Sequence, residues 1–236
     1  MLTAEQLEEL REFDTPTVWN ALEAMQLGST TSGFSYPGLR LRTPNTRPMV
    51  GYAATAKVTG WTKPTAGQKN LMFDFFEDVS AMQSPSIAVV EDIDERPIGS
   101  FWGEVQATTF QALGAVGTLT QGGVRDLAEV ASLGFYFFST EIMVARAESH
   151  VIDRSCPVSI SGMEVKPSDL IHADVHGAVV IPPEAAPGLA KACRIVADAE
   201  LYVLEPCRNA IAAGVKPQVD DLRKWRAEMA AHRVIN

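Results

Sequence analysis

Apolar strand-like segments alternate with helical segments through the middle of this chain, and this alternation limits the possible folds more than any other feature. Apolar runs typical of buried strands occur at residues 86–92, 115–120 and 135–138. Between them lie two segments with helical spacing of apolar residues, which end near Gly114 and Gly134. Strands separated by helices favour a mixed sheet with helices on its faces. The sequence therefore predicts an α/β protein.

The second half of the chain carries the signals of hairpins and then of helices. Residues 155–165 alternate in polarity, and residues 170–181 form two apolar runs around a polar turn. Two prolines then precede a long helical pattern, which we expect to cover about residues 184–204. A last amphipathic pattern covers about residues 219–231. These signals predict late hairpin strands followed by two helices.

The composition is typical of a globular protein and argues against several classes of partner. Of the 236 residues, 46% are hydrophobic and 21% are charged, which suffices for a substantial core. The formal net charge of −9 argues against a nucleic-acid surface, because binding to phosphates requires a basic patch. The three cysteines are far apart, which argues against a disulfide framework. We find neither a signal-peptide core nor a membrane span, and we expect a cytoplasmic protein without membrane or nucleic-acid partners.

A candidate site lies where the strand at residues 115–120 gives way to the next helix. The sequence there is GGVRDLAE over residues 122–129. We expect Arg125 and Asp126 at a strand-to-helix turn, where free backbone N–H groups favour anions. Asp126 and Glu129 are three residues apart and share a helical face. This set could hold a divalent metal and an anionic substrate together. The simpler alternative is a common acid at a helix start beside a surface arginine.

Three motifs in this order resemble the RraA-like family. The first is WGE at residues 102–104, and the second is GGVRDLAE at residues 122–129. The third is SDLIHADVHGAVVIP at residues 168–182. In the family signature, a spacer of about twenty residues separates a glycine from the Arg-Asp pair. Here 21 residues separate the glycine of the first motif from the arginine of the second. The resemblance covers most of the chain, from about residue 14 to residue 200.

This resemblance implies a fold, an activity and an assembly. The family includes class II pyruvate aldolases that cleave 4-hydroxy-4-methyl-2-oxoglutarate and 4-carboxy-4-hydroxy-2-oxoadipate, and also a regulatory branch that inhibits RNase E. The implied fold is a layered β/β/α arrangement like that of swivelling phosphohistidine domains, with mixed sheets and flanking helices. We expect one such domain at residues 1–207 and a helical extension at residues 208–236. Homotrimers, often paired into homohexamers, with active sites at subunit boundaries are also implied.

The implied reaction is the metal-dependent cleavage of a 4-hydroxy-2-oxo diacid through a pyruvate enolate, with oxaloacetate decarboxylation as a side activity. By resemblance, Asp126 is the direct ligand of Mg²⁺ or Mn²⁺, which prefer oxygen ligands. Arg125 would bind the carboxylate and keto oxygen of the substrate and stabilise the enolate, as its planar fork suits this role. The backbone N–H groups of Gly103, Glu104 and Val105 would bind the substrate carboxylate. The Glu104 side chain would hold metal-bound water.

Two further acids complete the implied site. Glu129 ends the Arg-Asp-x-x-acid pattern and would orient its neighbours. The family also uses an acid from the C-terminal helix of a neighbouring subunit, for which Glu200 is the best match and Asp198 the second. An exposed acid on a long helix is more commonly only part of a solvated face.

A second possible metal site is suggested by His172, Asp174 and His176. Alternate residues of a strand share one face, so these three side chains could chelate a cation. A hairpin turn around Asp174 explains the same residues, and we favour it because the resemblance places the metal at Asp126.

Departures from the family pattern leave the substrate open. Gln121 replaces an acid before the glycine pair, Asn20 replaces an early Asp, and residues 141–150 lack an Arg-Gly turn. A regulator that binds an RNase is one alternative, although that branch lacks the Asp that Asp126 provides here. A metal-dependent lyase or hydrolase acting on another 2-oxo or hydroxy acid is the other, because a fold does not determine a substrate.

Overall fold

The computed structural model describes residues 1–29 and 31–235 and divides the chain into two compact units. One unit contains both ends of the chain, Met1–Thr30 and Glu184–Asn236, and its elements are helices. The other unit, Thr31–Pro183, contains the sheets and three helices. The boundary expected at residue 208 falls inside one long helix, α6 (Leu189–Ala213), which continues without a break at that point.

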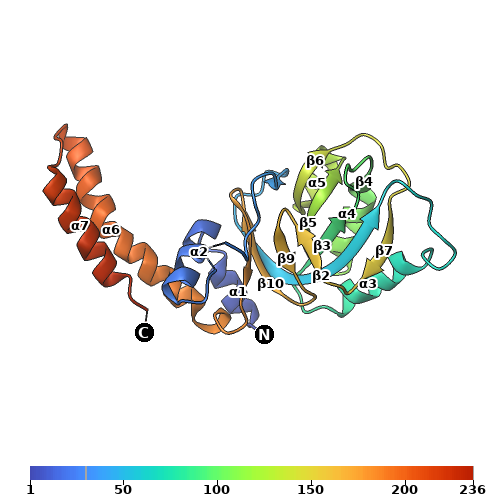
Figure 1. The fold of residues 1–236 in the computed structure, drawn as a ribbon, viewed down its shortest axis with the longest axis horizontal. Helices are drawn as coiled ribbons and strands as arrows, with labels where there is room; N and C mark the ends of the chain where they lie inside the picture. Colours follow the sequence, from blue (N-terminus) through green and yellow to red (C-terminus); the bar gives the residue numbers. More distant parts are fainter. Residues whose placement is uncertain (30, 236) are drawn as a thin grey trace. The chain divides into compact units, whose positions relative to one another are not determined.

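A nine-stranded mixed sheet forms the centre of the second unit (Figure 1). The order is β1, β6, β5, β3, β2, β10 and β11, while β4 pairs with β5 and β7 pairs with β2. Neighbours among β2, β3, β5 and β6 are parallel, whereas β1, β7, β10 and β11 pair in antiparallel fashion. The strands are β1 Arg40–Leu41, β2 Met49–Thr59, β3 Ser86–Asp92, β4 Ser100–Trp102, β5 Ala115–Val124, β6 Tyr136–Ile142, β7 His150–Arg154, β10 Leu170–Asp174 and β11 Gly177–Ile181.

The main sheet is buried on both faces, which explains why its central strands are almost continuously apolar. Successive residues of β3 point to opposite sides, so that Ala88 and Val90 join one core cluster while Ile87 and Val89 join the other. The first cluster also contains residues of the helices α3 (Leu71–Ala81), α4 (Glu104–Ala112) and α5 (Leu127–Leu133). The second contains the hairpin of β8 (Val158–Ile160) and β9 (Met163–Val165), a two-stranded sheet of its own.

An aromatic cluster attaches α4 and α3 to the sheet next to the WGE motif. Trp102 is fully buried at the end of β4, and its ring centroid lies 4.8 Å from that of Phe110 on α4. Phe110 in turn lies 5.2 Å from Phe75 on α3. These contacts hold the junction between β4 and α4, where Gly103 precedes the first helical residue.

The predicted strands and helices of this unit are confirmed, with four differences. β5 runs through the glycine pair to Val124, so these glycines belong to a strand and not to the turn. β1, β4 and β7 were not expected from the sequence. β4 has only three residues, and β7 (HVIDR) mixes charged and apolar residues without a clear period. Their strand conformation depends on pairing with β5 and β2.

The helical unit contains α1 (Ala4–Leu10), α2 (Thr15–Ala24), α6 and α7 (Val219–His232), with a short 3₁₀ turn at Ala186–Gly188. The side chain of Thr3 caps α1 and that of Asp14 caps α2, as helix starts require. The long helix begins later than the expected residue 184, because Ala186–Gly188 forms the 3₁₀ turn first. It continues to Gly214, which adopts the left-handed conformation that ends a helix. None of the described helices is long and apolar enough to cross a membrane.

Candidate functional site

The candidate site forms where β4 and β5 end side by side. The backbone N–H of Arg125 donates to the carbonyl oxygen of Trp102 at 3.1 Å, which joins the two strand ends. Asp126 follows in the left-handed conformation (φ 57°, ψ 44°), and α5 begins at the next residue. This conformation costs most residues energy, but Asp tolerates it better than most. Arg125 and Asp126 therefore lie at the strand-to-helix turn that the sequence predicted.

Gly103 makes the close approach of the first two motifs possible. A Cβ atom on Gly103 would lie 2.5 Å from Asp126 Oδ2 and 3.2 Å from Arg125 Nε. The glycine has an extended backbone (φ −157°), so the position requires free space and not an unusual conformation. Because Gly103 has no side chain, the functional groups of Arg125 and Asp126 can lie in the space that a side chain would fill.

One carboxylate oxygen of Asp126 is held by the protein. The backbone N–H of Glu104 donates to Asp126 Oδ2 at 3.0 Å, and Arg125 Nε lies 3.8 Å from the same oxygen. Arg125 Nη1 also donates to the carbonyl oxygen of Val144 at 3.5 Å. Within residues 1–29 and 31–235, Oδ1 of Asp126 has no hydrogen bond or ion pair. The side chains of Arg125 and Asp126 are 39% and 38% exposed, so both can meet a solute.

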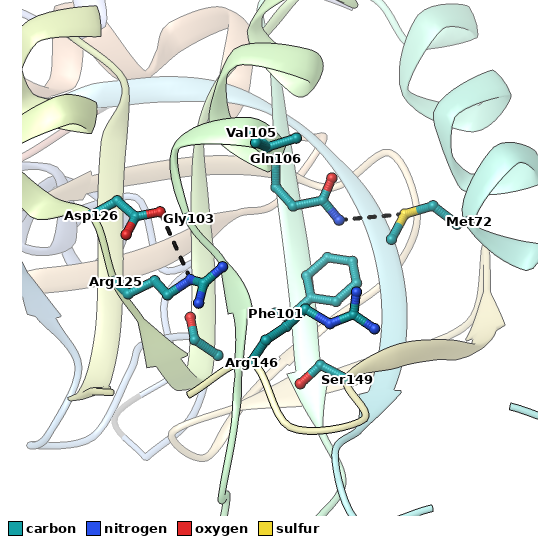
Figure 2. A pocket seen from close by; sticks show the side chains of 10 residues that line it. Met72, Phe101, Gly103, Val105, Gln106, Arg125, Asp126, Arg146 and Ser149 are labelled. Carbon is teal, nitrogen blue, oxygen red and sulfur yellow. Dashed lines mark hydrogen bonds and ion pairs between the residues drawn. The ribbon is translucent and has the colours of Figure 1, made fainter. Parts of the chain in front are cut away.

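A cavity of about 350 Å³ opens beside this pair (Figure 2). Two guanidinium groups and one carboxylate are the charged groups of its lining. The cavity is therefore positive in a chain whose net charge is −9, which favours an anionic ligand. The lining residues are Met72, Ser100, Phe101, Gly103, Val105, Gln106, Arg125, Asp126, Arg146 and Ser149.

The structure differs from the expected roles at Glu104. Four predicted residues, Gly103, Val105, Arg125 and Asp126, line the cavity, but the exposed Glu104 side chain is not part of the lining. The N–H of Glu104, expected on the substrate carboxylate, donates to Asp126 instead. The structure therefore shows Glu104 orienting the Asp126 carboxylate through its backbone.

The other predicted acids lie outside the cavity lining. Glu129 is exposed on α5, and its side chain has no hydrogen bond or ion pair to any described residue. Glu200 lies on α6 in the helical unit, and its Oε1 accepts a hydrogen bond of 3.4 Å from Asn20 Nδ2. Its contribution to a neighbouring subunit's site, and that of Asp198, stay predictions.

Sequence reasoning missed Arg146 and Ser149, which line the cavity from the loop between β6 and β7. The N–H of Ser100 donates to the carbonyl oxygen of Ala145 at 2.8 Å, which ties this loop to β4. Gly99 lies directly against the loop, because a Cβ there would collide with the carbonyl oxygen of Arg146. No periodicity or motif in residues 141–150 signals this contact.

The residues of the second possible metal site form the expected hairpin. Asp174 pairs with Gly177 at the end of β10 and β11. Asp174 Oδ1 accepts the backbone N–H of His176 at 2.8 Å and lies 3.1 Å from its Nδ1. The hairpin interpretation of this segment is therefore confirmed.

A hard divalent cation suits the donor set at Asp126. In the described part of the chain, no group of three or more His, Cys, Asp or Glu side chains could hold a metal together. Mg²⁺ keeps several waters and uses one or two carboxylates, whereas structural Zn²⁺ requires four nitrogen or sulfur ligands. An accessible Oδ1, with Oδ2 held by one hydrogen bond and one ion pair, therefore fits Mg²⁺ or Mn²⁺.

Asp92 is a buried carboxyl group at the end of β3, outside the cavity lining. It is 4% exposed, and burial raises its pKa from an ordinary value of 3.8 to about 6. A hydrogen bond from the N–H of Asp94 to Oδ1, 3.1 Å long, partly opposes this rise in the pKa.

Two curated relatives match parts of the chain. Protein DlpA of Legionella pneumophila is 34% identical over 83 residues, which is 34% of this chain and 14% of that protein. A protein of Halalkalibacterium halodurans, named provisionally as a 4-hydroxy-4-methyl-2-oxoglutarate aldolase, is 29% identical over 100 residues. That match covers 42% of this chain and 48% of the relative. The chain thus spans less than half the length of either relative.

Solved structures share the fold over most of the chain. An uncharacterized protein of Pseudomonas syringae pv. tomato superposes with a TM-score of 0.71 at 23% identity, over 96% of this chain and 94% of that one. Streptomyces coelicolor RraAS2, described as an unusual member of the RNase ES inhibitor RraA family, has a TM-score of 0.67 at 22% identity. That superposition covers 88% of this chain and 97% of RraAS2.

A family profile also matches the chain. The profile described as RraA-like, Aldolase/RraA, covers residues 15–180. This range contains the cavity and the first two motifs completely, and most of the third. The protein belongs to the RraA-like (Aldolase/RraA) family.

Proposed function

We propose that this protein is a divalent-metal-dependent aldolase that cleaves a 4-hydroxy-2-oxo diacid through a pyruvate enolate, with oxaloacetate decarboxylation as a side activity. The observation that carries the proposal is the pair of Arg125 and Asp126, fitted against Gly103 at a positive cavity. Family membership and the name of the Halalkalibacterium relative support it. The two reactions share the enolate, so one site can perform both.

Arg125 would bind and stabilise the reacting end of the substrate. Its guanidinium group has one weak hydrogen bond and one ion pair in the described chain, so most of its donors are free for a ligand. A planar fork of N–H donors matches a carboxylate and an adjacent keto oxygen. The same positive charge would lower the energy of the enolate as the carbon–carbon bond breaks.

Asp126 would hold the cation. The N–H of Glu104 and the Arg125 side chain keep its Oδ2 in place, so that Oδ1 faces a ligand in a defined orientation. A bound Mg²⁺ or Mn²⁺ would act as a Lewis acid that polarises the keto group of the substrate.

A base must remove the C4 hydroxyl proton of an aldol substrate. We assign this role to Glu104, whose exposed side chain lies at the start of α4 outside the cavity lining, or to Glu200 from a neighbouring subunit. Glu129 would orient the turn. The second assignment requires the proposed homotrimer or homohexamer, and a monomeric mass by sedimentation would exclude it. We also propose that the small β8–β9 sheet, the main sheet and the helices are the three layers of the swivelling β/β/α fold.

The test is oxaloacetate decarboxylation with Mg²⁺ or Mn²⁺, in the wild type and in Arg125→Ala and Asp126→Asn. Asn keeps the left-handed backbone accessible and removes the charge, so folding should survive. We expect each variant to lose at least about 100-fold in kcat/KM, the usual effect of losing a principal electrostatic group. Arg96→Ala is the matched control, because Arg96 is exposed and outside the cavity lining. Absence of metal-dependent turnover of both oxaloacetate and a 4-hydroxy-2-oxo diacid in the wild type would refute the proposal.

A negative result would favour one of two other functions. Family membership also supports a regulator that binds an RNase, and capture of a purified RNase equally by wild type and Asp126→Asn would favour it. Turnover of another 2-oxo or hydroxy acid in a substrate screen would favour a different metal-dependent lyase or hydrolase.

A further inference from the structure

The cavity lining contains a second arginine, Arg146, to which the proposed cleavage reaction assigns no role. Arg125 comes from the end of β5, whereas Arg146 comes from the loop between β6 and β7. Figure 2 shows both side chains extending from different segments into the space that the ten lining residues enclose. The cavity thus has a cation beside Asp126 and another one beside Ser149.

The backbone beneath Arg146 is fixed at several points. Ser100 donates to the carbonyl oxygen of Ala145 at 2.8 Å, and Ser149 donates to that of Arg146 at 3.3 Å. Gly99 packs so closely against the Arg146 carbonyl that a Cβ at this position would collide with it. Arg146 is therefore presented to the cavity by a loop with defined contacts to β4.

The guanidinium group of Arg146 is available to a ligand. Among residues 1–29 and 31–235 it has no hydrogen bond and no ion pair. Asp126 is the one carboxylate of the lining, and its Oδ2 is already engaged by Glu104 and Arg125. A second anionic group on the ligand would give Arg146 a partner with charge-assisted hydrogen bonds.

The wall of the cavity also suits a carbon chain. Phe101, Met72 and Val105 contribute apolar surface to the lining, and Gln106 contributes a polar amide group. A cavity of about 350 Å³ is at the small end of the usual range for ligand sites. A short chain with an acidic group at each end matches a lining that combines two cations with apolar side chains.

We propose that Arg146 binds the distal carboxylate of a 2-oxo diacid whose 2-oxo acid end is bound by Arg125, and so selects diacids over monoacids. The inference rests on the proposed function for the orientation of the substrate. Arg146 is then a specificity residue. Its loss should weaken the binding of the diacid and leave the reacting end of the molecule unaffected.

A binding experiment tests this without requiring turnover. The probes are 2-oxoglutarate and 2-oxopentanoate, which have the same five-carbon chain and differ in the distal carboxylate. Titration calorimetry with Mg²⁺ should show the wild type preferring 2-oxoglutarate by about 10- to 100-fold, the effect of one hydrogen-bonded charge pair. Arg146→Met keeps an unbranched side-chain stem without the charge and should remove this preference, while Arg146→Lys should restore part of it. Arg96→Met should bind as the wild type does.

Turnover separates this inference from the proposed function. With 4-hydroxy-4-methyl-2-oxoglutarate, Arg146→Met should raise KM by about 10-fold or more and leave kcat within about twofold, because Arg146 would contact the distal carboxylate and not the keto oxygen on which the enolate charge develops. Cleavage of the monoacid 4-hydroxy-2-oxopentanoate should be unchanged. Equal effects on diacid and monoacid, or an unchanged preference for 2-oxoglutarate, would overturn the role of Arg146 even in an active aldolase. A wild type without cleavage that still shows an Arg146-dependent preference for 2-oxoglutarate would refute only the aldolase proposal.

Discussion

At the scale of single residues, the site depends on a missing side chain as much as on the charged ones. Arg125 and Asp126 are adjacent in sequence, but their functional groups are placed by Gly103, 22 positions before Arg125. Asp126 Oδ2 occupies the volume in which any larger residue would have its Cβ. The glycine of the family signature therefore has a steric explanation in this chain.

Gly103→Ala should disable the site while the protein stays folded. The added Cβ would lie 2.5 Å from Asp126 Oδ2, so the carboxylate must move and lose its hydrogen bond from Glu104. We expect metal-dependent decarboxylation to fall by at least about 100-fold. Gly67→Ala is the matched control, because a Cβ at Gly67 would meet no atom within 4 Å. Full activity in Gly103→Ala would show that this close approach is not required.

Asp92 should make the stability of the protein depend on pH. Its folded-state pKa of about 6 exceeds the ordinary value of 3.8, so between these values the folded state binds more protons at this group than the unfolded state does. The free energy of unfolding therefore falls as the pH rises from about 4 to 6, by about 2 to 3 kcal/mol from this group. Asp92→Asn can keep the acceptor for the N–H of Asp94 and removes the titration.

Urea denaturation at several pH values measures this effect. The difference in unfolding free energy, wild type minus Asp92→Asn, should decrease across the window from about pH 4 to pH 6 and be constant above it. A difference that does not change with pH would show that the pKa of Asp92 is not raised by burial.

At the scale of secondary-structure elements, helix α4 links the core to the site. Its first residue, Glu104, directs a backbone N–H to Asp126, and its buried Phe110 packs against Trp102 at the end of β4. The same nine-residue helix therefore connects the aromatic cluster to the carboxylate. This coupling explains why the WGE motif combines a buried tryptophan, a glycine and an exposed acid.

Phe110→Ala should be strongly destabilising. The ring is fully buried, with centroids at 4.8 Å from Trp102, 5.2 Å from Phe75 and 5.3 Å from Phe76. Removing such a ring leaves a cavity and costs about 3 to 5 kcal/mol. Thr108→Ala, at an exposed position of the same helix, should change the unfolding free energy by less than about 0.5 kcal/mol. Similar urea midpoints for both variants would contradict the packing role of Phe110.

At the scale of the whole molecule, global charge and local charge have opposite signs. The net charge of −9 argued against a nucleic-acid surface, but it gave no indication of a positive cavity. The two arginines of this cavity come from segments 21 residues apart, which meet only because β6 lies beside β5 in the sheet. Each of the two units also contains buried apolar side chains, and the helical unit is formed by both ends of the chain.

The sequence alone determined the elements and half of the site. Periodicity and the glycine, proline and capping residues depend on neighbours within a few positions, so they predicted the alternating strands and helices, both hairpins and the turn at Arg125 and Asp126. The resemblance of three ordered motifs identified the family.

Tertiary structure decided the rest, because it depends on which distant segments become neighbours. Three-residue β4 and the mixed sequence of β7 become strands only by pairing with longer partners. The N–H of Glu104 is used by Asp126 because the ends of β4 and β5 meet. Arg146 reaches the cavity because its loop is hydrogen-bonded to Ser100. No spacing along the chain encodes these contacts, since they arise from the order and register of the strands in the sheet.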